Sequence, residues 1–564
     1  MKRTYQKKTY RGLYPQKQKT EQMRKILLTA LLTVSMATMA QLKLNFSADS
    51  PLRKLQIAEM AIESLYVDSL DANNIVEEGI KGMLSRLDPH SSYSSAKETK
   101  ELTEPLEGNF DGIGVQFNMI EDTLLVIQTI SGGPSAKVGI LAGDRIVAVN
   151  DTAIAGVKMS RTDIMKRLRG KKGTKVTVSV KRPGERSLLT FRITRDKIPL
   201  NSVDAAYIIE PGIGYVKLQK FSATTHAEVV AAIDSLKTVS ESLAPDKEFS
   251  LILDLQDNGG GYLSAAERVA DEFLNEDALI VYTTGRAVPR HESRATGHGR
   301  MRRGNIVLLV NEYSASASEI VSGAVQDQDR GVVVGRRTFG KGLVQRPIEL
   351  PDGSMIRLTV AHYYTPTGRC IQKPFKPGDK KDYDMDINER LKKGELTCRD
   401  SIHFADSLKY ETLNDHRTVY GGGGIMPDIF VPLDTMKYTR YHSKLVAKGI
   451  IVTKILKYFD KNRKTLMQYP DVAEFKKSYE TPMSLLDEIV KEGEKEGVTP
   501  KDEEEKQRAL PEMARQIKAL IARDIFTQSA YYEVINDSND IYNEGVRIIR
   551  EMNTTGKKVR EMTQ

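Results

Sequence analysis

The spacing of apolar residues divides the chain into segments of different secondary structure. Apolar side chains recur at helical spacing from residue 51 to about 105 and again beyond about residue 435. Between these stretches come short apolar runs separated by glycines, and from about Ile198 strands alternate with helices. We therefore predict a multidomain α+β protein in which a β-rich module precedes a layered α/β core, with helical segments at both ends. The predicted parts after a leader at 1–40 span residues 41–105, 106–197, 198–436 and 437–564.

Two local signals sharpen this division. In the β-rich module, a helix is predicted over 161–168, because Ser160 precedes it and Asp163 follows three residues later, as in a capping box. In the core, Asp352-Gly353 separates two apolar runs and predicts a hairpin turn.

The formal net charge of +9 invites a nucleic-acid hypothesis, but the charge is unevenly distributed. Residues 1–40 contain nine basic residues and a single acid, Glu21, so the rest of the chain is nearly neutral. A nearly neutral body lacks the broad basic surface that binding to phosphates needs. We therefore expect no nucleic-acid partner.

The basic leader has the pattern of a secretory signal. Met23-Arg24-Lys25 precedes the short apolar stretch 26–39, and small residues stand at Thr38 and Ala40. The alternative is an uncleaved N-terminal anchor, although the stretch is short for a membrane span of about 20 residues. We expect an exported, periplasmic protein, soluble or anchored to the inner membrane by its leader.

The chain has two cysteines, Cys370 and Cys398. Outside a reducing cytosol they permit one disulfide, and free thiols are the alternative. The sequence contains neither Cys-x-x-Cys nor His-Glu-x-x-His. We therefore expect no structural zinc, no zincin site and no cofactor.

A serine-rich turn is the first candidate for chemistry. A buried strand predicted over 306–310 runs through a turn of small residues into a helix that begins near Ser316. This geometry places a serine at a strand end, beside helix amides whose dipole favours negative charge. The serine is useful as a nucleophile only if a base accepts its proton. The alternative is that Ser314, Ser316 and Ser318 only cap the helix.

A lysine between two glycines is the candidate base. Gly340 and Gly342 let the backbone approach closely and bury the Lys341 side chain, and desolvation lowers a lysine pKa. A neutral amine can accept a serine proton. In an extended chain Gln345 lies on the same face and orients the amine. The alternative is an ordinary surface lysine in a hairpin.

Two sequence motifs and one glutamine together resemble those of the carboxy-terminal processing proteases. These are PDZ-containing, tail-specific serine peptidases with a Ser–Lys–Gln triad. The motifs are Ser-Ala-Ser-Ala-Ser-Glu-Ile at 314–320 and Phe-Gly-Lys-Gly at 339–342, and the glutamine is Gln345. The resemblance covers roughly residues 55–430 and includes the segments 112–115, Gly143-Asp144-Arg145-Ile146, and 421–424 with Pro427-Asp428. It implies a PDZ domain at 106–197 and a crotonase-like (ββα) serine protease core at 198–436. It also implies that Ser316 is the nucleophile, Lys341 the base and Gln345 the third member.

The resemblance further implies an oxyanion hole made of two backbone amides. Ala317 follows the nucleophile directly, and Gly260 is the second donor in the Asn258–Gly261 loop. Gly259 stands where the family often has proline, which makes this loop more flexible.

Other residues are alternative candidates for the site. Asp327 lies eleven residues after Ser316, about 16 Å along a helix, so we assign it a structural role. A Ser–His–Asp triad is the competing hypothesis, since the chain contains His291, His298 and His362.

The glycines of the β-rich module suggest how a peptide binds. The amides of Gly112, Ile113, Gly114 and Val115 are expected to receive a terminal carboxylate, and the tail then adds as a strand. Ile164 and Leu168 are expected to form the pocket for the last side chain, which predicts apolar C-termini.

Together these features predict an exported serine endopeptidase that captures C-terminal tails and cleaves them through an acyl-enzyme. Its expected partners are proteins with apolar C-terminal tails, with an adaptor protein and a second copy of the chain as further candidates. The alternative is a non-catalytic module that uses the same fold to bind tails or hydrophobic ligands.

Overall fold

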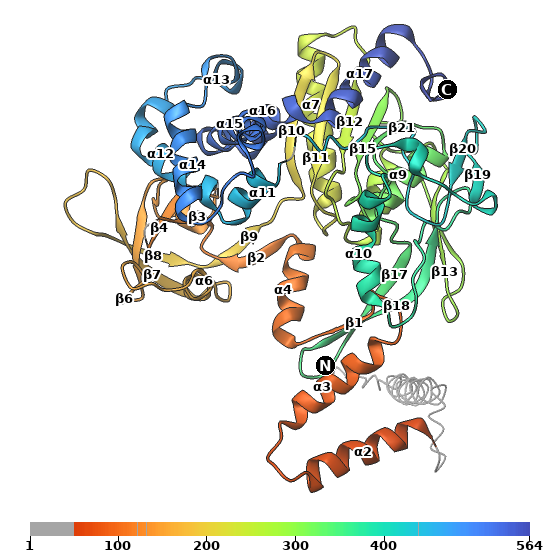
Figure 1. Ribbon diagram of the computed structural model, residues 1–564, viewed down its shortest axis with the longest axis horizontal. Helices are drawn as coiled ribbons and strands as arrows, with labels where there is room; N and C mark the ends of the chain where they lie inside the picture. The colour runs from red at the N-terminus through yellow and green to blue at the C-terminus, as the bar shows by residue number, and fades with distance from the viewer. Residues whose placement is uncertain (1–49, 121, 131, 438, 564) are drawn as a thin grey trace, which may run out of the picture. The chain divides into compact units, whose positions relative to one another are not determined.

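The computed structural model describes residues 50–563 except 121, 131 and 438 (Figure 1). The described residues divide into two units, with the boundary after Gly82. The first contains α2 (Pro51–Leu65) and most of α3 (Ala72–Leu84). The predicted leader, residues 1–40, lies outside the described residues.

The β-rich module is a six-stranded antiparallel sheet with two helices, α5 (Pro134–Lys137) and α6 (Arg161–Leu168). As predicted, α6 is capped by Ser160, whose hydroxyl accepts the Asp163 amide at 3.1 Å. The two-stranded ribbon β2 (Asn109–Gly112) and β9 (Asp196–Pro199) leads into and out of the module. The sheet strands are β3 (Val115–Ile120), β4 (Thr123–Thr129), β5 (Arg145–Val149), β6 (Thr152–Ala153), β7 (Lys175–Lys181) and β8 (Leu189–Thr194).

The core is built on a second six-stranded sheet with the order β10-β11-β12-β15-β16-β21. Only the β10–β11 pair is antiparallel, and the other neighbours are parallel. The central strands are buried on both faces, which explains why they are continuous apolar runs in the sequence. The strands are β10 (Val203–Glu210), β11 (Ile213–Leu218), β12 (Ser250–Asp254), β15 (Ile306–Val310), β16 (Val332–Gly335) and β21 (Ile429–Phe430).

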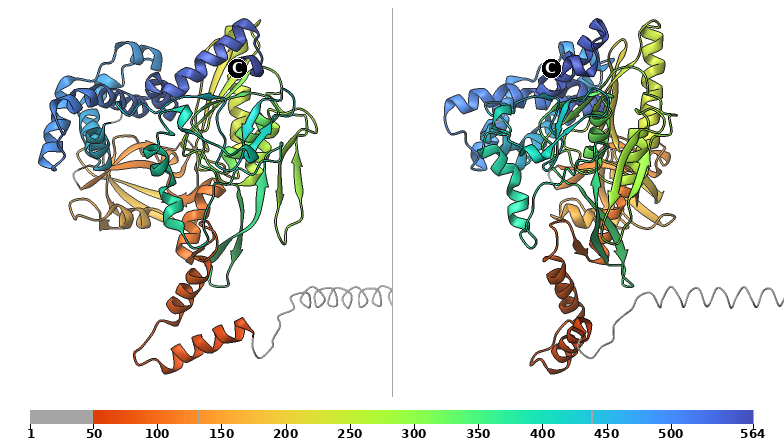
Figure 2. Two further views of the ribbon diagram at one scale, coloured as in Figure 1. Left: turned by 45° about the vertical axis from the view of Figure 1, so that its right-hand side comes forward. Right: turned by 90° about the vertical axis from the view of Figure 1, so that its right-hand side faces the viewer.

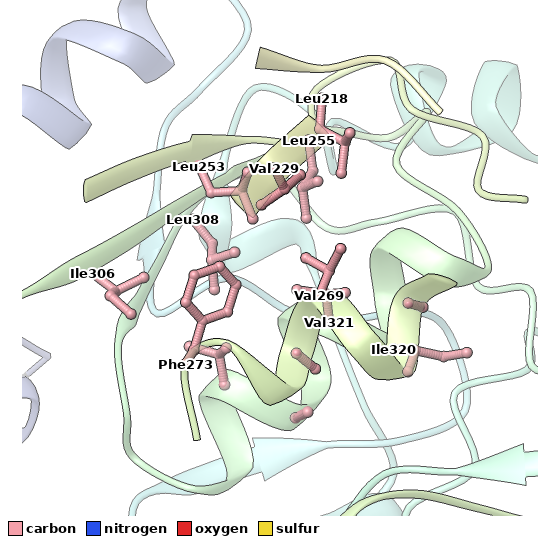
Figure 3. Close-up of a cluster of buried hydrophobic side chains, with 14 of the residues drawn as sticks. Leu218, Val229, Leu253, Leu255, Val269, Phe273, Ile306, Leu308, Ile320 and Val321 are labelled. Atoms are coloured by element: carbon pink, nitrogen blue, oxygen red, sulfur yellow. The ribbon is translucent and has the colours of Figure 1, made fainter. Parts of the chain in front are cut away.

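Helices cover both faces of this sheet. On one face, α7 (Thr225–Leu243), α8 (Leu263–Asp271) and α9 (Ala317–Asp327) pack on side chains such as Leu253 and Leu308 (Figure 3). On the other face lies α17 (Asp540–Thr555). Gly545 allows the close approach of α17, since a Cβ there would lie 2.6 Å from Leu309 Cδ2.

A smaller antiparallel sheet and its neighbouring helices complete the core. The predicted hairpin is present as β17 (Leu343–Glu349) and β18 (Met355–Tyr364), joined at Asp352-Gly353. The other strands and helices of this region are β1 (Ser92–Ser94), β13 (Leu279–Thr284), β14 (His291–Arg294), β19 (Lys409–Glu411), β20 (Thr418–Tyr420), α4 (Ala96–Glu107), α10 (Lys380–Lys392) and the short turns η1 (Arg399–Ser401) and η2 (Asp406–Leu408).

The C-terminal region is helical, as predicted, and α12 (Ile450–Leu466) packs beside the β3–β4 part of the β-rich module (Figures 1 and 2). Leu456 of α12 buries Leu125 and Ile127, and Asp460 pairs with Arg145 at 2.6 Å. Among residues 50–563, no helix has the length and apolar character needed to cross a membrane. The remaining elements are α11 (Arg440–Ala447), α13 (Val472–Ser478), α14 (Met483–Lys495), α15 (Glu503–Ile525), α16 (Gln528–Ile535), η3 (Asn536–Ser538) and α18 (Val559–Met562).

Both cysteines are free thiols. Cys370 is partly buried and Cys398 is exposed. The disulfide that the sequence permits is therefore absent.

Candidate active site

The three serines of the 314–318 turn have different surroundings. Ser314 and Ser318 are fully buried, and their hydroxyls donate to the carbonyls of Leu255 (2.7 Å) and Asn258 (2.8 Å). These bonds tie the turn to the loop after β12. Ser316 is only half-buried and takes the position before α9 with φ +57°, a conformation that is strained for a non-glycine residue. Of the three serines, only Ser316 is therefore partly accessible to solvent.

Lys341 lies between β16 and β17 and is largely buried. Its Nζ donates to Gln345 Oε1 at 3.0 Å, which is the contact that their spacing predicts. Burial and, to a lesser extent, the charge of Arg357 lower the pKa of Lys341 to about 8, while Glu319 and Asp88 oppose the shift. A lysine with this pKa is partly neutral near neutral pH.

Glu319 joins the serine and lysine segments. It is fully buried, and its Oε2 accepts the amides of Ser316 (2.7 Å) and Lys341 (2.9 Å). Its Oε1 accepts the Gly340 amide (2.7 Å) and the Thr338 hydroxyl (2.6 Å). Burial raises the pKa of Glu319 to about 6, although these four donors favour the charged form.

A second link runs through Tyr363 of β18. Its hydroxyl lies 3.1 Å from the Ser316 carbonyl and within hydrogen-bond distance of the Lys341 carbonyl. The backbones of the two residues are therefore held together on two sides.

The Glu319→Gln variant is expected to lose about 2 kcal/mol of unfolding free energy, although it removes a buried charge. The substitution relieves the burial penalty that raises the pKa of the carboxylate, which offsets part of the loss. However, the new NH₂ group faces two donors, and each lost bond to the carboxylate costs about 1.5–3 kcal/mol. Thermal denaturation and cleavage rates measure the effect.

The matched control for this prediction is Glu292→Gln, which changes an exposed carboxylate bonded to Arg290 and Arg294. It should change stability by less than about 0.5 kcal/mol. Equal effects of the two substitutions would contradict the role given to Glu319.

The two predicted oxyanion donors lie against each other. Gly260 has φ +97°, and a Cβ there would lie 2.8 Å from Ser316 Cβ and 2.9 Å from the Ala317 amide nitrogen. The Gly260 amide itself donates to Asn258 Oδ1 at 2.9 Å. Its role as a donor therefore stays a prediction, and it requires an exchange of hydrogen-bond partner when a substrate binds.

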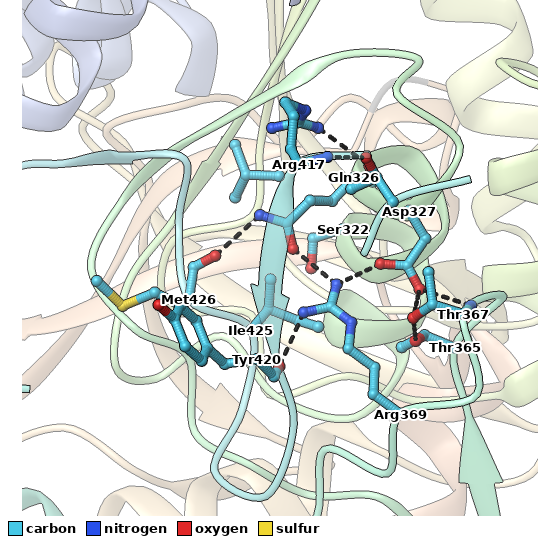
Figure 4. A network of polar contacts seen from close by, with 12 residues as sticks. Ser322, Gln326, Asp327, Thr365, Thr367, Arg369, Arg417, Tyr420, Ile425 and Met426 are labelled. Carbon is cyan, nitrogen blue, oxygen red and sulfur yellow. Dashed lines mark hydrogen bonds and ion pairs between the residues drawn. The ribbon is translucent and has the colours of Figure 1, made fainter. Parts of the chain in front are cut away.

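Asp327 lies in a separate buried network (Figure 4). Its carboxylate pairs with Arg369 at 2.5 Å and accepts the amide and hydroxyl of Thr367. This environment agrees with the structural role predicted from its distance along the helix.

The histidines of the competing triad hypothesis are exposed. In the part of the chain that the structure describes, His291, His298 and His362 make no hydrogen bond to the Ser316 turn. The histidine that does reach the site is His90, whose carbonyl accepts Gln345 Nε2 at 2.7 Å.

Sequence reasoning missed Glu319, Tyr363 and His90 as parts of this site. Glu319 was detectable, because it occupies the third position of α9, where a glutamate typically caps the helix. Tyr363 and His90 have no local signal, since only the folded chain brings them here.

The β-rich module contains an apolar groove of about 300 Å³ between β3 and α6. Of the predicted peptide-binding residues, Gly112, Ile113, Gly114, Val115 and Leu168 line it. Ile164 does not, and this prediction is wrong: its side chain is fully buried in the core of the module. One residue further along α6, Met165 faces the groove together with Arg161.

Comparison with known families supports both domains. Residues 212–384 match the description "Peptidase family S41", and residues 112–193 match "PDZ domain". Residues 441–527 match a family of unknown function. The two functional matches lie inside the predicted ranges 198–436 and 106–197.

Curated relatives agree with these matches. A carboxy-terminal-processing protease of Bartonella bacilliformis is 36% identical over 59% of this chain and 78% of its own length. A carboxy-terminal processing protease of Bacillus subtilis is 32% identical over 61% of this chain and 72% of its own length. A solved structure, the photosystem II D1 C-terminal processing protease, is 31% identical over 56% of this chain and 83% of its own, with a TM-score of 0.32.

A PDZ domain followed by a serine-type peptidase domain is therefore the class of protein that the chain represents. The chain belongs to peptidase family S41, among the carboxy-terminal processing proteases.

Proposed function

We propose that this protein is an exported endopeptidase that binds C-terminal tails in its PDZ groove and cleaves them with Ser316, Lys341 and Gln345. The observation that carries the proposal is the state of the Lys341 amine. It is largely buried, has a pKa lowered to about 8, and is held by Gln345 on a segment that Glu319 ties to Ser316.

In the proposed reaction, neutral Lys341 accepts the proton of the Ser316 hydroxyl as its oxygen attacks the scissile carbonyl. The amides of Ala317 and Gly260 stabilise the resulting oxyanion. Lys341 then gives its proton to the leaving amine, which leaves an acyl-enzyme on Ser316. A water molecule, deprotonated in turn by Lys341, hydrolyses this ester and restores the serine.

Gln345 is proposed to orient the amine by accepting a hydrogen bond from it. Because lysine carries three rotatable donors on a flexible stem, an uncontrolled amine spends little time in line with the serine. The 3.0 Å contact with Gln345 Oε1 restricts it.

The chemistry of the groove supports capture of a free C-terminus. Its floor is apolar, and its lining contains two arginines, Arg161 and Arg169, and no carboxylate. Such a groove favours an apolar last residue and a terminal carboxylate, which the glycine-rich amides of 112–115 would bind.

The Met165→Glu variant is expected to bind tail peptides at least about tenfold more weakly, which corresponds to about 1.4 kcal/mol. The new carboxylate would lie in the apolar groove and repel the carboxylate of the tail. Fluorescence anisotropy with a labelled peptide that ends in Leu-Ala-Ala measures the affinity.

Thr162→Glu is the control for this prediction, because it adds the same charge to an exposed position of the same helix. It should leave the affinity within about twofold. If both variants bind as the wild type does, the tail is captured elsewhere.

A direct experiment tests the proposal as a whole. The full chain is incubated with a protein that ends in apolar residues and with the same protein ending in Asp-Asp. Mass spectrometry should show shortening of the first and not of the second. Equal cleavage of both would contradict recognition of apolar tails.

Export and assembly are part of the same proposal. The basic and apolar leader supports export to the periplasm, and N-terminal sequencing of the protein from that compartment tests cleavage after Ala40. An adaptor protein and a second copy of this chain are further proposed partners, which light scattering and pull-down with the Ser316→Ala variant would detect.

A further inference from the structure

The segment Asp88-Pro89-His90-Ser91, which breaks a helix in the sequence, forms a tightly bonded turn. Asp88 Oδ1 accepts the amides of His90 (2.9 Å) and Ser91 (3.1 Å), and Oδ2 accepts the Ser91 hydroxyl (2.5 Å). Burial works against the charge of Asp88, but the hydrogen bonds outweigh it and lower the pKa of Asp88. The carboxylate is therefore ionised at neutral pH.

The turn is fastened to β18 by Thr359. The Thr359 hydroxyl donates to Asp88 Oδ1 at 2.8 Å, and the Thr359 amide donates to the Ser91 hydroxyl at 3.1 Å. Since β18 pairs with β17, which contains Gln345, the turn has a fixed position relative to that side chain.

The bonds of the turn aim the His90 carbonyl at Gln345. Gln345 Nε2 donates to this carbonyl at 2.7 Å, while Gln345 Oε1 accepts Lys341 Nζ at 3.0 Å. A carbonyl can only accept, so it draws the NH₂ end of the amide and leaves the oxygen facing the lysine. Without this acceptor the Gln345 amide could turn over, and its NH₂ group would then face the Lys341 amine, which is itself a donor.

The His90 ring is held from the other side. Its Nε2 lies 2.9 Å from the Tyr383 hydroxyl, and the two rings meet edge to face with centroids 5.1 Å apart. Gln372 Nε2 donates to the same hydroxyl at 3.2 Å, and Gln372 Oε1 accepts the Gly342 amide at 2.8 Å. The chain of contacts thus returns to the residue that follows Lys341.

We propose that the Asp88–Ser91 turn is a positioning element of the catalytic site, which fixes the orientation of the Gln345 amide and through it the Lys341 amine. This inference rests on the proposed function, because it assumes that Lys341 is the base. Asp88 and His90 do not touch the reacting atoms and act through Gln345.

The charge of Asp88 adds a signature that can be measured. Three charged groups act on the pKa of the Lys341 amine: Arg357 from β18 lowers it, while Glu319 from α9 and Asp88 from the turn raise it. His90, whose pKa burial lowers to about 4, is neutral. Removal of the Asp88 charge should therefore move the acid limb of the rate profile to lower pH, because the amine then loses its proton more readily.

The test is a double-mutant cycle of Asp88→Asn and Gln345→Ala in the full chain, with kcat and KM measured across pH on a fluorogenic peptide. At a pH well above 8, where the amine is neutral, Asp88→Asn should lower kcat about 10- to 100-fold with KM within about twofold. In the Gln345→Ala background it should lower kcat less than about twofold further, because residues that act through one another are not additive. The acid midpoint of Asp88→Asn should lie a few tenths of a pH unit below that of the wild type.

The matched control is Asp352→Asn. Asp352 makes the same kind of turn, with its Oδ1 accepting the amide and hydroxyl of Ser354, in the exposed β17–β18 hairpin. This variant should behave as the wild type does. If Asp88→Asn does not fold, as judged by circular dichroism, Ser91→Ala, which removes one bond of the turn, replaces it in the cycle and is judged on the kcat criteria alone.

Two results would overturn the inference. One is an Asp88→Asn enzyme whose kcat and acid midpoint equal those of Asp352→Asn. The other is a loss of kcat without the expected signature, either because the loss is additive with that of Gln345→Ala or because the acid midpoint of Asp88→Asn does not move. Failure of the proposed function gives a different result, because the Ser316→Ala variant would then still cleave the peptide.

Discussion

The Ser316→Ala variant is expected to cleave tails at least about 10⁵-fold more slowly than the wild type, because no acyl-enzyme can form. The other two serines of the turn cannot substitute, since Ser314 and Ser318 are buried and their hydroxyls donate to carbonyls. Tail binding should be unchanged, because the groove lies in the PDZ domain. Product mass spectrometry and peptide anisotropy on the same preparation separate the two effects.

Ser322→Ala is the control for this variant. Ser322 lies on the same helix, and its hydroxyl bonds within α9 to the Ser318 carbonyl at 2.8 Å. Its removal should leave kcat within about twofold. Cleavage by Ser316→Ala at the wild-type rate would place the nucleophile elsewhere in the chain.

The Lys341→Ala variant is expected to lower kcat about 10³- to 10⁴-fold, because the serine then lacks its general base. Lys341→Arg should be equally inactive, since a guanidinium keeps the charge but does not release its proton in the accessible pH range. Lys392→Ala, which changes an exposed lysine of α10, is the control and should be fully active.

The pH dependence provides an independent check on Lys341. The amine must be neutral to accept a proton, and its pKa is lowered to about 8. The wild-type kcat/KM should therefore rise about tenfold per pH unit below 8 and level off above it. A profile that is flat from pH 6 to 9 would show that no group with this pKa acts as the base.

Several features of the site were readable from the sequence because they depend on neighbours in the chain. The strand over 306–310 and the turn that follows it place Ser316 before a helix, and the structure agrees. Three residues of extended chain separate Lys341 from Gln345, and their side chains meet. The PDZ and peptidase ranges were predicted for the same reason, since their motifs are short and local.

The error at Ile164 has a specific physical cause. The sequence identifies an apolar stripe on the helix over 161–168 but not which apolar residue faces the sheet of the module and which faces the groove. Packing decides this, because Ile164 fills the core while Met165, one helical step away, lines the groove.

The sequence by itself determined the order of the domains, the serine-rich turn before a helix, and the spacing that brings Lys341 to Gln345, because each depends on residue types at short spacing. Only the tertiary structure decided that Glu319 and Tyr363 hold the two segments together, that the Gly260 amide is already bonded to Asn258, and that the carbonyl of His90 faces Gln345. Apart from the Gly260–Asn258 bond, these relations join segments that lie far apart in the chain, up to 255 positions for His90 and Gln345. Hydrogen bonds between such residues depend on how the sheets and loops pack, which no local pattern encodes.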